Sequence, residues 1–257
     1  MITGKTRIAA VLGFPVEHSR SPAMLNAAFA ATSIDAVMVP MAIAPDDLPA
    51  AIAGLRAMRA IGASVTIPHK VEVAKLCDEL SDDARAIGAV NCLQFDGAKL
   101  VGHNTDAPGF VDGLRAAGFD PAGKRTIVLG AGGAARAIVH ATGGLVVSRR
   151  PAEWTASRPW SEARAAFADA ELVVDTTPIG MTDREPYDLL LDALQAHAWV
   201  ASLIYHREPA LLRDARARGL ATHDGAAMLV HQGARAFALW TGRRAPVEAM
   251  ANALHAS

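Results

Sequence analysis

The sequence predicts an α/β protein of two domains whose sheets are mostly parallel. Its 257 residues exceed the commonest single-domain size, and 51% hydrophobic against 20% charged residues suffices for packed cores. Short apolar runs rich in β-branched residues alternate with alanine- and leucine-rich segments at helical spacing. Strands that alternate with helices indicate parallel sheets covered by helices on both faces.

The elements of the first half are expected in the following order. Apolar runs predict strands at Ile8–Leu12, Ala36–Met41, Ala63–Thr66 and Val90–Phe95. Helical spacing predicts helices at Pro22–Ala31, Asp46–Arg59, Val71–Leu80 and Pro108–Ala117. Ser21 is expected to be the N-cap before Pro22, because a serine hydroxyl accepts hydrogen bonds from the free N–H groups of a first turn.

The second half repeats the alternation and then ends on helices alone. Strands are predicted at Thr126–Leu129, Leu145–Val147, Leu172–Asp175 and Val200–Ile204. Helices are predicted at Gly133–Ala141, Leu211–Arg218, Ala226–Trp240 and Val247–His255. The last two helices carry no strand, so they are expected to complete the first domain. The predicted domains are therefore 1–106 with 227–257, and 107–226.

The composition argues against several classes of protein, namely nucleic-acid-binding, membrane and metal-binding proteins. Lys and Arg number 25 against 26 Asp and Glu, which does not favour nucleic acid or an anionic membrane as a partner. The stretch poorest in charge contains Asn26, Asp35 and Pro40 and predicts no membrane helix. Cys77 and Cys92 form no CxxC pair, which favours a reducing, cytoplasmic setting. The nine histidines lack ligand spacing, so no metal site is expected.

A glycine-rich loop follows the predicted strand Thr126–Leu129. It fits GxGxxA, in which the first glycine permits the turn, the second admits a pyrophosphate and the small third residue packs the helix on the strand. Free N–H groups at the helix N-terminus suit phosphate. The alternative is a plain glycine-rich turn. The predicted dinucleotide contacts are Gly130, Ala131, Gly132, Gly133 and Ala134.

The end of the next predicted strand indicates which dinucleotide binds. An acidic residue there suits the ribose 2′-hydroxyl of NAD, whereas arginine suits the 2′-phosphate of NADP. The sequence has Ser148, Arg149 and Arg150 at this place and no acid before Glu153. NADP(H) is therefore the predicted cofactor, and a solvated basic turn is the alternative.

A second group of polar residues lies in the first half. Ser19 and Ser21 follow the first strand at a helix N-terminus, where hydroxyl and N–H groups suit a carboxylate, although Ser21 could be a cap only. Lys70 lies just past Pro68 in the loop after the third predicted strand, and Asn91 and Asp106 stand at similar loop positions. Most lysines face solvent, so a solvated side chain is the alternative for Lys70 taken by itself.

Taken together, these segments resemble the shikimate dehydrogenase family over nearly the whole chain. The motifs that carry the resemblance are Ser19 with Ser21, Ser64–Lys70, Gly88–Asn91, Asn104–Gly109, the Gly130 loop, Thr177–Met181, Gly225–Gln232 and Trp240–Gly242. The family reduces 3-dehydroshikimate to shikimate with NADPH, on the route to aromatic amino acids. The resemblance implies the same reaction of a small-molecule substrate here. A monomer or a homodimer is expected, and the sequence does not distinguish between them.

The resemblance also implies roles for single residues. Lys70 would be catalytic and paired with Asp106. Contacts to the substrate would come from Ser19, Ser21, Ser64, Thr66, Asn91, Tyr205 and Gln232. Thr177, Gly225 and Met228 would lie at the cofactor, the last two near the nicotinamide.

Departures from the family pattern leave other functions open. Ser64 stands where many members have asparagine, which could admit quinate or an amino analogue of shikimate, with NADP or NAD. Ser148–Arg150 replaces the usual Asn-Arg-Thr, and Gly143 is expected to end the preceding helix early. A catalytically silent ligand-binding regulator is a third possibility, against which the Lys70–Asp106 pair argues.

Overall fold

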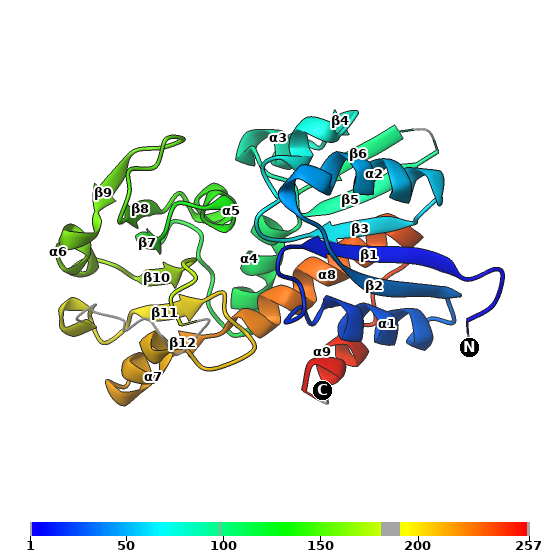
Figure 1. Ribbon diagram of the computed structural model, residues 1–257. Helices are drawn as coiled ribbons and strands as arrows, with labels where there is room; N and C mark the ends of the chain where they lie inside the picture. The colour runs from blue at the N-terminus through cyan, green and yellow to red at the C-terminus, as the bar shows by residue number, and fades with distance from the viewer. Residues whose placement is uncertain (1, 98, 181–190, 256–257) are drawn as a thin grey trace. The chain divides into compact units, whose positions relative to one another are not determined.

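The computed structural model describes residues 2–97, 99–180 and 191–255. The chain divides into two compact units, residues 1–109 with 230–257 and residues 110–229 (Figure 1). It passes from the first unit to the second within α4 (Asp106–Ala116) and returns within α8 (Gly225–Thr241). The sequence placed its domain boundaries at 106 and 226, and the substrate and cofactor roles of the two domains stay predictions.

The first unit is built on a mixed six-stranded sheet in the order β2-β1-β3-β5-β6-β4. Its strands are β1 (Arg7–Gly13), β2 (Ala36–Ala42), β3 (Gly62–Val65), β4 (Glu79–Leu80), β5 (Cys92–Asp96) and β6 (Lys99–His103). β1 runs parallel to β2 and β3, whereas β5 runs antiparallel to β3 and β6. The carboxyl ends of β1 and β3 consequently lie side by side, with Leu12 opposite Val65.

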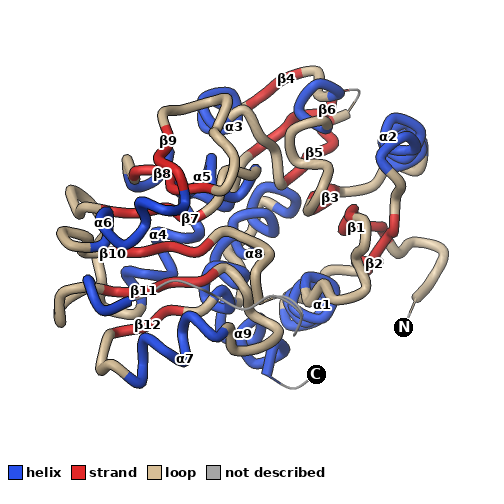
Figure 2. Tube along the Cα trace, turned by 60° about the vertical axis from the view of Figure 1, so that its left-hand side comes forward, coloured by secondary structure: helices blue, strands red, loops and turns tan. Residues whose placement is uncertain are grey.

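Helices cover this sheet and bring the C-terminal part of the chain into the first unit. They are α1 (Ser21–Ala31), α2 (Leu48–Ala57), α3 (Asp82–Ile87), the second part of α8 and α9 (Val247–His255). α1 packs against α9, and the two helices lie together in Figure 2. Trp240 of α8 donates from Nε1 to the Leu93 carbonyl, 2.9 Å away, which ties α8 to β5.

Two local predictions for the first unit are wrong. The segment predicted as a helix at 71–80 forms only a 3-10 turn, Val73–Leu76, followed by β4. Asp78 explains this, because its carboxylate accepts the Leu100 N–H at 2.7 Å and its own N–H donates to the Leu100 carbonyl. Pairing with a distant strand thus overrides helix propensity.

The second wrong prediction is the cap of α1. Ser21 is the first helical residue, Arg20 occupies the N-cap position, and no side chain caps the helix. The Ser21 N–H instead points back to Ser19 Oγ at 3.4 Å. Pro22 still lies in the first turn, where the missing N–H of proline costs nothing.

The second unit has a six-stranded sheet that is parallel throughout, in the order β12-β11-β10-β7-β8-β9. Its strands are β7 (Thr126–Leu129), β8 (Leu145–Ser148), β9 (Ser157–Pro159), β10 (Leu172–Asp175), β11 (Trp199–Ser202) and β12 (Ala221–His223). Its helices besides α4 and the start of α8 are α5 (Gly133–Thr142), α6 (Ala163–Phe167) and α7 (Ala210–Ala217). Counted from β7, the strand order is 3-2-1-4-5-6, which is that of the Rossmann fold.

The predicted α/β fold class is confirmed, although the short strands β4, β9 and β12, and β6, escaped prediction. α5 ends at Thr142, with Gly143 as its C-cap in the left-handed region at φ +67°, as the glycine pair predicted. No helix among the described residues is long and apolar enough to cross a membrane.

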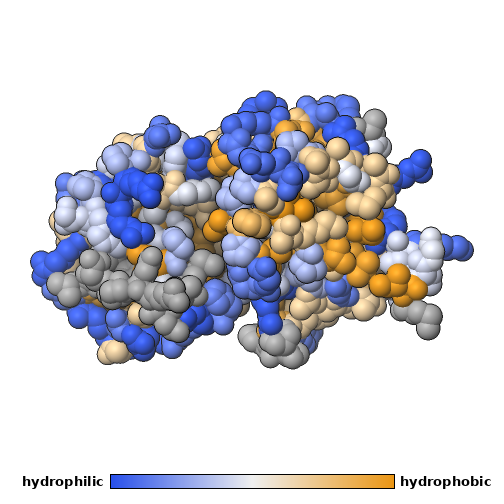
Figure 3. All heavy atoms as spheres, viewed as in Figure 1, coloured by the Kyte–Doolittle hydropathy of each residue, from blue (hydrophilic) through white to orange (hydrophobic). Residues whose placement is uncertain are grey.

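Side chains at the surface differ between the units. Figure 3 shows more apolar surface over the first unit than over the second. The large hydrophobic side chains found exposed in the described part of the chain all belong to the first unit, namely Ile2, Phe14, Met58, Ile67 and Val247. Phe14 and Ile67 lie at the adjacent carboxyl ends of β1 and β3, where the Phe14 N–H donates to the Ile67 carbonyl.

Candidate active site

Lys70 lies in the turn that follows β3, and backbone hydrogen bonds hold this turn in place. Its carbonyl accepts the Val90 N–H at 2.8 Å, and the His69 N–H donates to the Thr66 carbonyl. The Lys70 ammonium donates to Asp106 Oδ2 at 2.5 Å, and only 16% of its side chain is exposed. Asp106 is its only hydrogen-bond partner among the described residues, so the other ammonium hydrogens are available to a ligand.

Asp106 is held at the start of α4 by the preceding asparagine. The Asn104 side-chain oxygen accepts the N–H groups of Asp106 and Ala107, at 3.1 and 3.3 Å, and its amide nitrogen donates to the Ala89 carbonyl at 3.0 Å. A carboxylate in the first turn is also favoured by the helix dipole. Asp106 is therefore fixed by its backbone as well as by its partners.

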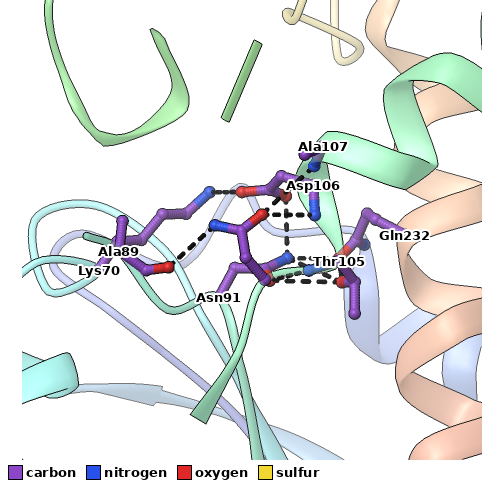
Figure 4. A network of polar contacts seen from close by, with 8 residues as sticks. Lys70, Ala89, Asn91, Thr105, Asp106, Ala107 and Gln232 are labelled. Carbon is purple, nitrogen blue, oxygen red and sulfur yellow. Dashed lines mark hydrogen bonds and ion pairs between the residues drawn. The ribbon is translucent and has the colours of Figure 1, made fainter. Parts of the chain in front are cut away.

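Asn91 joins the other polar residues of the site (Figure 4). Its Nδ2 lies 2.9 Å from Asp106 Oδ1, 2.9 Å from Thr105 Oγ1 and 3.2 Å from Gln232 Oε1. Its Oδ1 accepts the Thr105 N–H at 2.7 Å, which fixes the orientation of the amide because a backbone N–H can only donate. All four residues are at least nine-tenths buried.

The approach of α8 to α4 places Gln232 in this network. A Cβ at Gly109 would lie 2.6 Å from the Gln232 backbone nitrogen, a distance that real side chains do not adopt. Glycine at 109 thus allows the two helices to come close enough for Gln232 to reach Asn91. The structure brings together Lys70, Asp106, Asn91 and Gln232 as predicted site residues.

The remaining predicted substrate residues of the first unit lie nearby in the fold but outside this network. Ser64 is buried in β3 and pairs with Cys92 of β5. Thr66 follows β3, and its methyl group would meet a Cβ at Gly13. No hydrogen bond of the described residues joins Ser19, Ser21, Ser64 or Thr66 to Lys70 or Asp106, so their roles stay predictions.

Sequence reasoning missed three residues that build the site. Asn104 and Thr105 carry the hydrogen bonds described above, and the asparagine just before a helix start was the available signal. His69 is 1% exposed, and its Nε2 lies 2.8 Å from the Ile43 carbonyl. Because a carbonyl only accepts, Nε2 carries a proton, and the bond anchors the Lys70 turn to the segment after β2.

The glycine loop of the second unit has the features that a pyrophosphate requires. Gly130 has φ +105°, and a Cβ there would lie 2.7 Å from Thr176 Oγ1. Gly132 is the N-cap of α5, no side chain caps the helix, and nothing lies within 4 Å of a Cβ built at this position. Ala135 is fully buried on the sheet side. The free N–H groups beside Gly132, which include those of Gly133 and Ala134, therefore fit a bound phosphate.

The turn after β8 presents its two arginines to solvent. Ser148 is buried, and its hydroxyl donates to the Arg150 carbonyl, which closes the turn. Arg149 and Arg150 are both exposed. Their predicted phosphate contacts fit a guanidinium fork, while the Ser148 proton is engaged within the turn.

Asp175 ends β10 as an acid with few partners. Its Oδ1 accepts the N–H and hydroxyl of Thr177, at 2.9 and 2.7 Å. Oδ2 is buried and has no hydrogen-bond partner among the described residues. Burial raises the pKa of Asp175 to about 7, against the hydrogen bonds from Thr177. The predicted cofactor residue Thr177 thus already donates its hydroxyl within the protein.

The other predicted residues of the second unit lie after β11 and at the start of α8. The Tyr205 ring packs edge-on against His206. Position 225 requires a glycine, because the Cβ of any other residue would lie 2.2 Å from the Leu203 carbonyl oxygen. Met228 is buried in the core cluster that includes Phe110. Met181 lies outside the described residues.

Metal-binding side chains are not grouped in the part of the chain that the structure describes. No cluster of three or more His, Cys, Asp or Glu side chains there could hold an ion. The charge at the site comes from the Lys70–Asp106 pair.

A Rossmann-type unit with a glycine loop that fits a phosphate, together with a unit that holds a largely buried lysine–aspartate pair, is typical of two-domain dinucleotide-dependent dehydrogenases. Family profiles for the shikimate dehydrogenase substrate binding domain and the shikimate 5′-dehydrogenase C-terminal domain match residues 11–93 and 225–255. The shikimate dehydrogenase (NADP(+)) of Symbiobacterium thermophilum is 44% identical over 97% of this chain and 94% of its own. The chain belongs to the shikimate dehydrogenase family.

Solved structures agree with this assignment. Shikimate dehydrogenase from Aquifex aeolicus superposes with a TM-score of 0.93 at 32% identity, over 98% of this chain and 99% of that one. The enzyme from Thermus thermophilus, solved in complex with NADP(H) and shikimate, has a TM-score of 0.88 at 33% identity, over 97% and 99%.

Proposed function

We propose that this protein catalyses the reversible NADPH-dependent reduction of 3-dehydroshikimate to shikimate, a step toward aromatic amino acids. The largely buried Lys70–Asp106 pair, with its 2.5 Å contact, is the observation that carries this proposal. The NADP(+)-dependent relatives and the Thermus thermophilus complex support it.

Lys70 is the proposed proton donor. NADPH, when bound, supplies the hydride that reduces the ketone. The ketone oxygen gains negative charge as it is reduced, and the Lys70 ammonium can both stabilise that charge and protonate it. In the direction of oxidation the neutral amine takes the proton back. Asp106 keeps the ammonium in position and is itself held by Asn91 and Asn104.

Binding of the substrate is assigned to the remaining polar groups. The proposed contacts to the ring hydroxyls are Asn91, Gln232, Thr66 and Asp106. The proposed contacts to the carboxylate are Ser19 and Ser21. Tyr205 remains a predicted contact to the same carboxylate. Ser64, buried at 6% exposure in β3, is the residue that would distinguish shikimate from quinate or an amino analogue.

Cofactor binding is assigned to the second unit. The N–H groups beside Gly132 would hold the pyrophosphate, and Arg149 and Arg150 the 2′-phosphate of NADP. We infer a cytoplasmic enzyme, because both cysteines are free thiols, as is usual in a reducing compartment. A monomer or a homodimer is the proposed assembly.

The direct test measures the absorbance of reduced nicotinamide with purified protein in four mixtures, shikimate or quinate with NADP or NAD. Rapid reduction of NADP with shikimate is expected, and slow reaction in the other three mixtures. A preference for quinate would replace the proposed substrate and direct attention to Ser64. No reaction in any mixture would contradict the proposed activity and leave a ligand-binding regulator as the alternative.

A further inference from the structure

Trp154 connects the two loops that are assigned to the cofactor. It follows β8 and the Ser148–Arg150 turn, and its Nε1 donates to the Ala131 carbonyl at 3.0 Å. Ala131 lies between the two glycines of the phosphate-binding loop. The indole is partly buried against the core cluster of the second unit, so it is held from two sides. The position of one loop therefore depends on the other.

Arg136 lies one turn into α5 and rests on the same indole. Its guanidinium carbon is 5.0 Å from the centroid of the Trp154 ring, within the range of a cation–π contact. Partial burial lowers the pKa of Arg136, and the charge of Glu153 opposes this shift. No carboxylate lies within ion-pair distance of Arg136 in the described part of the chain. The Trp154 ring thus orients the Arg136 guanidinium, which has no carboxylate partner in the described part of the chain.

The turn after β8 offers only its two arginines as cations. In Rossmann folds this turn meets the 2′ position of the adenosine ribose. Ser148 donates its hydroxyl to the Arg150 carbonyl, so two exposed arginines are the donors that the turn itself offers. Trp154 orients Arg136 from the segment that directly follows this turn.

We propose that Arg136 is a third recognition cation for the 2′-phosphate of NADP, and that Trp154 is the residue that positions it. A planar guanidinium with several donors matches a phosphate and has no comparable partner on a free ribose hydroxyl. This inference rests on the proposed function in one respect, namely that the cofactor is NADP. It assigns the preference for NADP over NAD to two loops rather than to one turn.

Binding of adenosine 2′,5′-bisphosphate and of 5′-AMP to the full chain, measured by titration calorimetry, tests the inference without catalysis. Arg136→Gln should raise the Kd for the bisphosphate about 10- to 100-fold, as expected for a charge-assisted hydrogen bond, and that for 5′-AMP less than about twofold. Trp154→Ala should act in the same direction, whereas Trp154→Phe keeps an aromatic face and should retain most of the preference. Arg213→Gln, an exposed arginine of α7, is the charge-matched control.

Equal weakening of both ligands by Arg136→Gln, or no weakening of either, would overturn the inference. Thermal unfolding of each variant separates loss of binding from loss of fold. Oxidation of shikimate by the unaltered protein is measured alongside. If the protein does not oxidise shikimate but Arg136→Gln still weakens binding of the bisphosphate, the proposed substrate is wrong and the 2′-phosphate site stands. If the protein oxidises shikimate but Arg136→Gln binds the bisphosphate as tightly as the unaltered protein, the proposed function stands and the inference about Arg136 is wrong.

Discussion

The polar groups around Asp106 in the first unit and the loops proposed to bind phosphate in the second are organised in opposite ways. Around Asp106, both carboxylate oxygens and the backbone N–H have protein partners, of which Asn91 and Asn104 are buried and Lys70 is partly buried. Around Gly132, the helix start is uncapped and the nearby arginines at 149 and 150 are exposed. The groups assigned to proton transfer are thus oriented in advance, while those assigned to phosphate are left open for a ligand.

This difference follows from what each site has to do. A group that stabilises charge in a transition state is most effective when it is already oriented, since reorganisation during the reaction raises the barrier. A loop that binds a phosphate must instead keep its N–H groups unsatisfied by the protein. Two aspartates differ in the same way: Asp106 is paired on both oxygens, whereas Oδ2 of Asp175 has no hydrogen-bond partner in the described part of the chain.

The largest expected effect comes from breaking the prearranged pair. Lys70→Ala should lower kcat about 10²- to 10⁴-fold, because it removes the proton donor and the positive charge next to the developing oxyanion. Binding of NADP, measured by calorimetry, should be unchanged. Lys75→Ala, which removes an exposed lysine paired with Glu72 close by in the chain, is the control and should keep full activity. A Lys70→Ala variant within about threefold of the unaltered kcat would show that another group donates the proton.

The partly unpaired carboxyl group of Asp175 should make the stability of the protein depend on pH. Its pKa is about 7 in the folded protein against 3.8 as the ordinary value, so the folded state binds more protons than the unfolded state between these pH values. The free energy of unfolding should therefore fall as pH rises from about 4 to about 7. Asp175→Asn removes the buried charge and should stabilise the protein at pH 8 by roughly 2–4 kcal/mol.

That gain should shrink toward pH 4, where the acid is neutral. Denaturant unfolding at several pH values measures it, with the exposed Asp169→Asn as the matched control. A gain independent of pH would mean that Asp175 does not titrate in this range in the folded protein.

A smaller effect is expected from the contact between α4 and α8. Gly109→Ala places a Cβ 2.6 Å from the Gln232 backbone nitrogen and should cost about 1–3 kcal/mol through overpacking. The displacement of Gln232 should also raise KM for shikimate. Gly54→Ala in α2 is the matched control, because open space surrounds it and alanine should stabilise that helix by about 0.5–1 kcal/mol. Comparable melting temperatures for the two variants would contradict the close approach.

Much of the molecule could be predicted from local sequence. In the Rossmann-type unit, the strands β7, β8, β10 and β11, the Gly130 loop and the end of α5 at Gly143 were predicted, whereas the short strands β9 and β12 were not. Lys70, Asn91, Asp106 and Gln232 came from ordered motifs along the chain. These features depend on side-chain periodicity, on glycine at special backbone angles and on the order of motifs, and local sequence is enough to recognise each of them.

Contacts between distant segments decided the rest. The segment at 71–80 became a 3-10 turn and β4 because Asp78 pairs with Leu100 of β6. Trp154 met Ala131 and Arg136 across two loops. The hydrogen bonds that gather Asp106, Asn91 and Gln232 join residues far apart in the chain. Periodicity and propensity describe a residue's neighbours in sequence, whereas the partner of a buried polar group is settled only when the chain has folded around it.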